Sequence, residues 1–203
     1  DNINRMGLPT ERLQGVLLTH FHSDHIAEIY EVNLGSWVSG RPTPLTVFGP
    51  TGVDEVIDGV NASYRLDRIY RTGHHGEALL APELGVLAHK TIAPGVIFED
   101  GDLKITAYVS EHPPIEPAVG YRFDYKGRSV VVSGDSNVNG DTREIVDGAD
   151  LLLHDALSVP TVTALSKAMG AAGRSRQSKI VSDVMDYHAS TDSLIELGEQ
   201  SNI

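Results

Sequence analysis

The chain has 203 residues, 40% of them hydrophobic, and a formal net charge of −12 at neutral pH. Its length suits a single domain over residues 1–203, and no apolar run is long enough to cross a membrane. Because it contains no cysteine, disulfides and thiolate ligands are excluded, and any metal must be held by His, Asp or Glu.

The first predicted elements enclose a histidine-rich motif. The apolar run at residues 16–18 predicts a short buried strand, and residues 26–34 predict a helix. The sequence HFHSDH at positions 20–25 therefore lies at the carboxyl end of a strand, where open α/β sheets place their sites. His20 and His22 are two residues apart and should point the same way from an extended backbone. Imidazole and carboxylate donors suit zinc, and also manganese or iron.

The rest of the chain alternates between strand and helix patterns. Strands are predicted at residues 45–48, 96–98, 103–109, 119–125, 129–132 and 151–153. Helices are predicted at residues 53–60, 142–146 and 192–199. The patterns at 64–90 and 158–178 are too weak to assign an element. The alternation predicts an α/β fold with mixed strand pairing.

Four predicted strands run directly into His or Asp residues, so we expect these residues at a single sheet edge. They are His20, His22, Asp24, His25, His112, Asp135 and His154. A catalytic zinc takes about three protein ligands plus water, so this set suits two metals with a shared ligand. We assign His20, His22 and His112 to one metal and Asp24 and His25 to the other. The carboxylate of Asp135 bridges both.

The chain resembles the metallo-β-lactamase-fold hydrolases, and among these it is most similar to the ribonuclease Z and arylsulfatase-like branch. The resemblance rests on the motifs above together with Gly120-Tyr121-Arg122, Leu153-His154-Asp155 and the segment 187–191. The resemblance implies an αββα sandwich with a di-zinc site. It implies a chain incomplete at both ends, with strands before residue 1 and a last metal-binding histidine beyond residue 203. It also implies that His188 contacts the scissile phosphate and can protonate the leaving group. His154 and Asp155 match a His-Glu pair of that branch, with Asp in place of Glu.

Two features depart from ribonuclease Z. Ribonuclease Z enzymes commonly bind tRNA with a long projecting arm inserted between the Gly-Tyr-Arg and Gly-Asp segments. At that position this chain has only the predicted hairpin 123–133. The acidic charge also favours a small substrate, since nucleic-acid binders usually carry a basic stripe. Here the basic residues are scattered apart from one modest cluster at Arg174, Arg176 and Lys179.

The predicted function is metal-dependent hydrolysis of phosphodiesters with two zinc ions, or with Mn²⁺ or Fe²⁺ in their place. Asp24 and Asp135 would orient the attacking hydroxide, and His188 would be the acid, with Asp155 as a further catalytic residue. One alternative is a lactam, lactone or sulfate-ester hydrolase on the same site, and another is a non-catalytic metal-binding module. Expected partners are a small ester or phosphodiester or an RNA 3′ end, no membrane, and a second copy in a homodimer. Localisation stays open, with the cytoplasm favoured.

Overall fold

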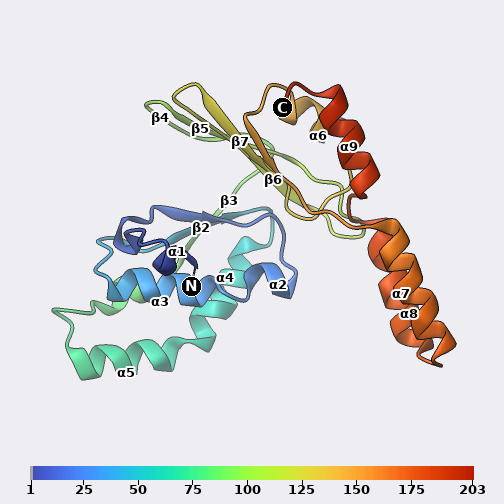
Figure 1. Ribbon diagram of the computed structural model, residues 1–203. Helices are drawn as coiled ribbons and strands as arrows, with labels where there is room; N and C mark the ends of the chain where they lie inside the picture. Colours follow the sequence, from blue (N-terminus) through green and yellow to red (C-terminus); the bar gives the residue numbers. More distant parts are fainter. Residues whose placement is uncertain (1) are drawn as a thin grey trace. The chain divides into compact units, whose positions relative to one another are not determined.

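The computed structural model describes residues 2–203, and Asp1 lies outside this range. The chain divides into two compact units, residues 1–92 and 93–203. Each has its own β-sheet and its own helices (Figure 1). This is the α/β content with mixed pairing that the sequence predicts. No helix in residues 2–203 combines the length and apolar character needed to span a membrane.

The first unit contains a parallel three-stranded sheet in the order β1-β2-β3. Its strands are β1 Gly15–Leu17, β2 Thr46–Gly49 and β3 Ala88–Thr91. Its helices are α1 Asn2–Arg5, α2 Ser23–Ile26, α3 Ile29–Val38, α4 Val53–Ser63 and α5 Arg65–His75, with short 3₁₀ turns η1 Thr10–Arg12 and η2 Pro82–Gly85. The core is formed by buried residues in and next to the strands and by residues of α3 and α4: Leu18, Ile29, Leu45, Val47, Val53, Ile57 and Leu87.

Two stretches of this unit differ from the predictions. The helix predicted at 26–34 is two helices, of which α2 already begins at Ser23. The stretch 64–90, left without elements, contains α5, η2 and β3. The periodicity missed α5 because the only residue that this helix buries is Arg68, which counts as polar in an apolar pattern.

The second unit contains a five-stranded sheet in the order β4-β5-β6-β7-β8. Its strands are β4 Gly95–Asp100, β5 Leu103–Val109, β6 Val119–Tyr125, β7 Arg128–Val132 and β8 Leu151–Leu153. Both predicted hairpins are present, and the tight turn between β6 and β7 has positive φ at Lys126 (50°) and Gly127 (75°), as a type I′ turn requires. The remaining elements are α6 Gly140–Val146, α7 Val159–Ala171, α8 Ser175–Asp183, η3 Val184–Asp186 and α9 Thr191–Gln200.

Strand direction places three of the predicted strand ends together. β5 and β7 are each antiparallel to β6, and β8 is parallel to β7, so β5, β7 and β8 all run the same way. Their carboxyl ends, which lead to His112, Asp135 and His154, therefore share one edge of this sheet. The prediction that four strands end at a single sheet edge is wrong for one of them. β1 pairs only with β2 and belongs to the other sheet, because hydrophobic runs alone do not say which strands pair.

Candidate functional site

In the first unit, the histidine motif follows β1 as a loop that enters α2. The β1 pairing continues to Leu18, whose amide donates to the carbonyl of Phe48 at 2.8 Å. The side chain of His20 is fully buried, with Nδ1 3.1 Å from the hydroxyl of Thr19. Its Nε2 lies 3.1 Å from Nδ1 of His22. One nitrogen of each imidazole is therefore close enough to the other for both to bind a single ion.

The donors of this loop fit a metal by chemistry and spacing. Two nitrogen ligands about 2.0–2.1 Å from one tetrahedral zinc lie about 3.3 Å apart, close to the separation of the His20 and His22 nitrogens. The ring of His25 is centred 4.2 Å from that of His20. Asp24, with 78% of its side chain exposed, has a carboxylate oxygen 3.6 Å from Nε2 of His25. Three imidazoles and one accessible carboxylate thus gather in a single turn of chain.

In the second unit, β5 ends at Val109 and leads through Ser110 and Glu111 to His112. The His112 ring is buried, and its Nδ1 lies 3.2 Å from the carbonyl oxygen of Tyr187. A carbonyl can only accept, so Nδ1 carries the proton in this hydrogen bond and Nε2 carries the lone pair. An imidazole fixed by a backbone carbonyl in this way is the usual form of a metal-binding histidine.

His188 lies between two carboxylates. Its Nδ1 is 2.8 Å from Oδ2 of Asp155, and its Nε2 is 3.9 Å from Oδ2 of Asp135. One donor atom from each of these residues lies within 4.8 Å of those of the other two. The His188 ring is also centred 5.7 Å from that of His112. The second unit therefore brings together four predicted site residues from four segments of chain.

Asp155 is fixed from several directions. Its Oδ1 accepts from the amide of Ser136 at 3.1 Å and lies 2.9 Å from Nδ1 of His154. Its Oδ2 accepts from His188 and from the amide of Ala189. Burial by itself raises the pKa of Asp155, but the hydrogen bonds from His154, His188 and Ser136 outweigh it and hold the pKa below its usual range. Asp155 is therefore an ionised acceptor that orients His188.

His154 lies against Asp155. Its side chain is 3% exposed, and its Nε2 is buried with no hydrogen-bond partner in residues 2–203. Sequence reasoning missed Ser136 and Tyr187, which act here through a backbone amide and a backbone carbonyl. Backbone amides and carbonyls occur at almost every position, so no pattern of residue types predicts which of them contact a site. The neighbouring motifs, Gly-Asp-Ser and Tyr-His-Ala-Ser-Thr, were the available signal.

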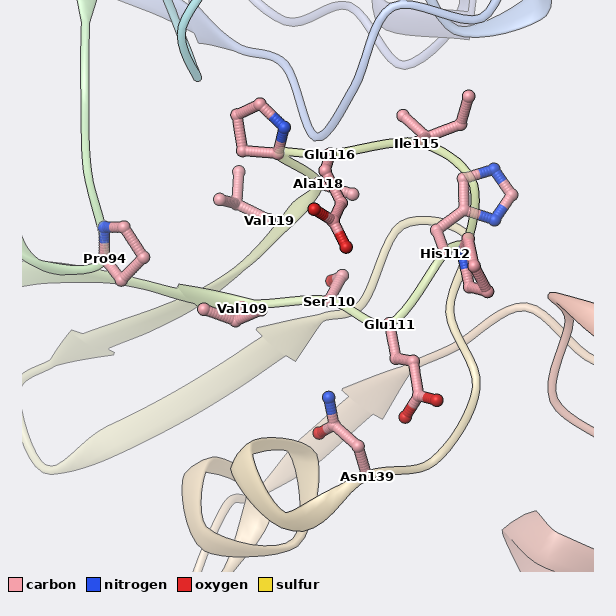
Figure 2. A pocket seen from close by; sticks show the side chains of 12 residues that line it. Pro94, Val109, Ser110, Glu111, His112, Ile115, Glu116, Ala118, Val119 and Asn139 are labelled. Carbon is pink, nitrogen blue, oxygen red and sulfur yellow. The ribbon is translucent and has the colours of Figure 1, made fainter.

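A pocket of about 730 Å³ opens beside His112 in the second unit. Figure 2 shows Glu111, His112 and Asn139 around it, with Ile115 and Glu116 on the loop that follows. The lining combines apolar side chains with two carboxylates. This volume lies within the range of small-molecule sites.

The predicted metal ligands are divided between the two units. His20, His22, Asp24 and His25 belong to the first unit, and His112 and Asp135 to the second. Each group is assembled locally as described above. The assignment of all six to a two-metal centre stays a prediction.

Comparison with known proteins agrees with these features. A model of the beta-lactamase superfamily domain matches residues 4–182. The ribonuclease Z of Mycobacterium bovis (strain BCG / Pasteur 1173P2) is 33% identical over 188 residues, which are 91% of this chain and 62% of the relative. A putative ribonuclease Z of Mycobacterium tuberculosis (strain CDC 1551 / Oshkosh) is 33% identical over 178 residues, 86% of this chain and 73% of the relative. The chain thus spans less than two thirds of the M. bovis relative.

Solved structures support the same fold. The short form of human tRNase Z aligns with a TM-score of 0.62 at 19% identity, covering 98% of this chain and 73% of that one. A long-form RNase Z from yeast aligns with a TM-score of 0.60 at 14% identity, over 95% of this chain and 27% of that one. At these identities the likeness concerns the fold alone, the metallo-β-lactamase fold that the sequence motifs predict. From the family model and the curated relatives together, the chain belongs to the beta-lactamase superfamily and is related within it to proteins named ribonuclease Z.

Proposed function

We propose that this protein is a metal-dependent phosphodiester hydrolase of the ribonuclease Z type, acting on RNA 3′ ends. The observation that carries the proposal is His188, held by Asp155 at 2.8 Å with its other nitrogen toward Asp135. Cleavage of a phosphodiester with an alkoxide leaving group needs an acid that protonates the leaving oxygen, and His188 lies beside the expected metal ligand Asp135. The relatives named ribonuclease Z support this substrate class.

We assign two zinc ions to the predicted ligands, with Asp135 shared between them. His20, His22 and His112 would hold one ion, and Asp24 and His25 the other. Support comes from the donor set, which is limited to nitrogen and oxygen in a cysteine-free chain, and from the paired nitrogens of His20 and His22. When bound, zinc would lower the pKa of a water molecule and supply positive charge for the attack on phosphorus.

The residues of the chain supply orientation and a proton. Nδ1–H of His188 donates a hydrogen bond to the carboxylate of Asp155, so the ring of His188 is fixed with Nε2 directed away from Asp155. The imidazolium of His188 then gives its Nε2 proton to the leaving oxygen as the bond between phosphorus and that oxygen breaks. Asp155 stays ionised throughout and is a positioning residue, because it acts only through His188.

A second candidate is hydrolysis of a lactam, lactone or sulfate ester on the same site. The pocket beside His112 favours it, since about 730 Å³ with apolar walls suits the organic part of a small ester. The carboxylates of Glu111 and Glu116 in the lining would repel a second phosphate there. A metal-binding module without turnover is the remaining alternative.

A substrate panel tests the proposal. The full-length protein, metal-stripped and then reloaded with zinc, is assayed on a tRNA precursor with a 3′ extension, on bis(p-nitrophenyl) phosphate, and on a lactam, a lactone and an aryl sulfate. The proposal expects zinc-dependent turnover of the tRNA precursor and the diester above that of the other three. Turnover of only the latter group supports the second candidate. Zinc binding with no turnover on any substrate supports the binding module and refutes both hydrolase assignments.

A further inference from the structure

The helices α7 and α8 form a hairpin that extends away from the five-stranded sheet of the second unit (Figure 1). No residue of either helix is buried. The two helices are joined by small polar contacts, in which Ser166 and Ser178 each donate to the other's carbonyl at 2.8 Å. A Cβ added at Gly170 would lie 3.3 Å from the Ser178 hydroxyl, so the helices approach closely there. The hairpin is an ordered projection with its surface open to solvent.

The base of the hairpin is fixed to the candidate catalytic residues. The chain leaves for α7 at Leu157 and returns after η3 to the segment that carries His188. Leu157 and Ser190 form a parallel bridge, in which the Leu157 amide donates to Ala189 and the Thr191 amide donates to Leu157, both at 2.9 Å. Asp155 and His188 thus lie directly at the two ends of the inserted hairpin. A molecule bound along the hairpin would extend from this pair of residues.

The charge of the hairpin is opposite to that of the protein. Residues 158–183 contain four basic residues and one acidic residue, in a chain of net charge −12. The basic residues are Lys167, Arg174, Arg176 and Lys179, and all four are exposed. Lys179 forms an ion pair with Asp183 four residues later, so the positive charge available to a partner is mainly that of the other three.

The length of the hairpin indicates what kind of molecule could bind along it. α7 has 13 residues, which makes it about 20 Å long, so Arg174 and Arg176 at the far turn lie roughly that far from its base. A small ester bound near His188 cannot reach them. An RNA can, because its backbone carries negative phosphates continuously over such a length, and exposed Arg and Lys bind phosphates without reading sequence.

We propose that the α7–α8 hairpin holds the phosphate backbone of the RNA substrate at a distance from the cleaved bond. This inference rests on the proposed function for its substrate class. The contact lies in an insertion between Asp155 and His188, far along the chain from the β6–β7 hairpin. The hairpin provides a local positive charge in a chain whose net charge is negative. RNA affinity then depends on the hairpin, while the reaction of small diesters does not.

Binding and turnover are measured separately to test this. The hairpin variant is Lys167→Gln/Arg174→Gln/Arg176→Gln, and the matched control, Arg12→Gln/Arg65→Gln/Lys126→Gln, removes the same charge from exposed residues elsewhere. Binding of a fluorescein-labelled tRNA precursor to the full-length protein is followed by anisotropy over a series of KCl concentrations, in a His188→Ala background that slows cleavage. Turnover of the same RNA and of bis(p-nitrophenyl) phosphate is measured with His188 intact.

The hairpin variant should reduce the slope of log affinity against log salt by about 2 to 3, and the control by much less. Its KM for the tRNA precursor should rise, with kcat/KM on bis(p-nitrophenyl) phosphate unchanged. Equal slopes for the hairpin variant and the control overturn the inference, as does an unmodified protein without salt-dependent RNA binding. A change in oligomeric state with unchanged RNA affinity also overturns it and assigns the hairpin to contact with a second copy. If the unmodified protein turns over no diester at all, the proposed function is wrong. The anisotropy measurement then still tests whether the hairpin binds RNA.

Discussion

Nδ1 of His188 lies 2.8 Å from Oδ2 of Asp155, although 33 positions separate the two residues in the sequence. The hydrogen bond fixes the tautomer of His188 and directs its Nε2 toward Asp135. Asp155 has the carboxylate that the family's glutamate would supply, on a side chain one methylene shorter. The short contact means that the backbone here brings the two segments close enough for Asp to make the bond. The Leu157–Ser190 bridge beside them provides this approach.

Replacing His188 with Ala should lower turnover of diesters with poor leaving groups by about 10²–10⁴-fold, because the leaving oxygen loses its proton donor. Nitrophenolate leaving groups, which depart without protonation, should lose much less. Asp155→Asn should show the same dependence on leaving group with a smaller loss. The double variant should be no slower than His188→Ala alone, since Asp155 acts through His188. A loss of equal size across the leaving-group series would contradict the acid role.

Asp135→Ala should remove bound zinc together with activity. A bridging carboxylate contributes to both ions, so its loss weakens both, and the exposed Asp58 on α4 gives a matched control in Asp58→Ala. Elemental analysis of dialysed protein reads the metal content, and circular dichroism checks that the fold is retained. Wild-type zinc content in a folded Asp135→Ala protein would refute the bridging assignment.

The sequence predicted the strands of the second unit better than it predicted which strands pair and which helices follow them. β5, β7 and β8 were located because each is an apolar run that ends in His or Asp, and their common direction follows from the two hairpins and the parallel β8. The hairpin α7–α8 could not be assigned, because the residues that join its helices include Ser166, Gly170 and Ser178, which an apolar periodicity does not register. The supports of Asp155 were likewise invisible, since Ser136 contributes its backbone amide.

The first unit contains a buried guanidinium that lysine cannot replace. Arg41 is 1% exposed, and burial lowers its pKa. Its Nε donates to Ser36 at 3.0 Å, its Nη2 to Asn33 at 2.8 Å and Leu84 at 3.0 Å, and its Nη1 to the carbonyl of Thr43. These acceptors lie around a planar fork, and the single ammonium of lysine cannot reach them all.

Arg41→Lys should therefore lower the free energy of unfolding by about 2 kcal/mol or more, because buried acceptors are left without donors. Arg12→Lys, at an exposed position, is the control and should change it by less than about 0.5 kcal/mol. Urea unfolding followed by the fluorescence of Trp37 measures both, since Trp37 is the only tryptophan and belongs to the same unit. Equal midpoints for the two variants would show that the network around Arg41 contributes little.

Gly120 faces Tyr108 across the β5–β6 pair, and the approach is too close for any side chain at position 120. A Cβ added to Gly120 would lie 2.3 Å from Cζ and 2.5 Å from Oη of Tyr108. Tyr108 is 5% exposed and packs in a core cluster with Val131, Val146 and Leu197, so its ring cannot move aside without disturbing the contacts of α6 and α9. This packing explains why the Gly-Tyr-Arg segment begins with glycine.

Gly120→Ala should lower the free energy of unfolding by about 1–3 kcal/mol, the usual range for overpacking a core. Gly198→Ala is the control within the same unit, because Gly198 lies in α9 with nothing within 4 Å of an added Cβ. Alanine there should raise the free energy of unfolding by about 0.5–1 kcal/mol through helix propensity. Urea unfolding followed by far-ultraviolet circular dichroism measures both variants. The two substitutions add the same methyl group, so opposite signs isolate the contact with Tyr108, and a Gly120→Ala protein as stable as wild type would mean that β5 and β6 separate easily at this point.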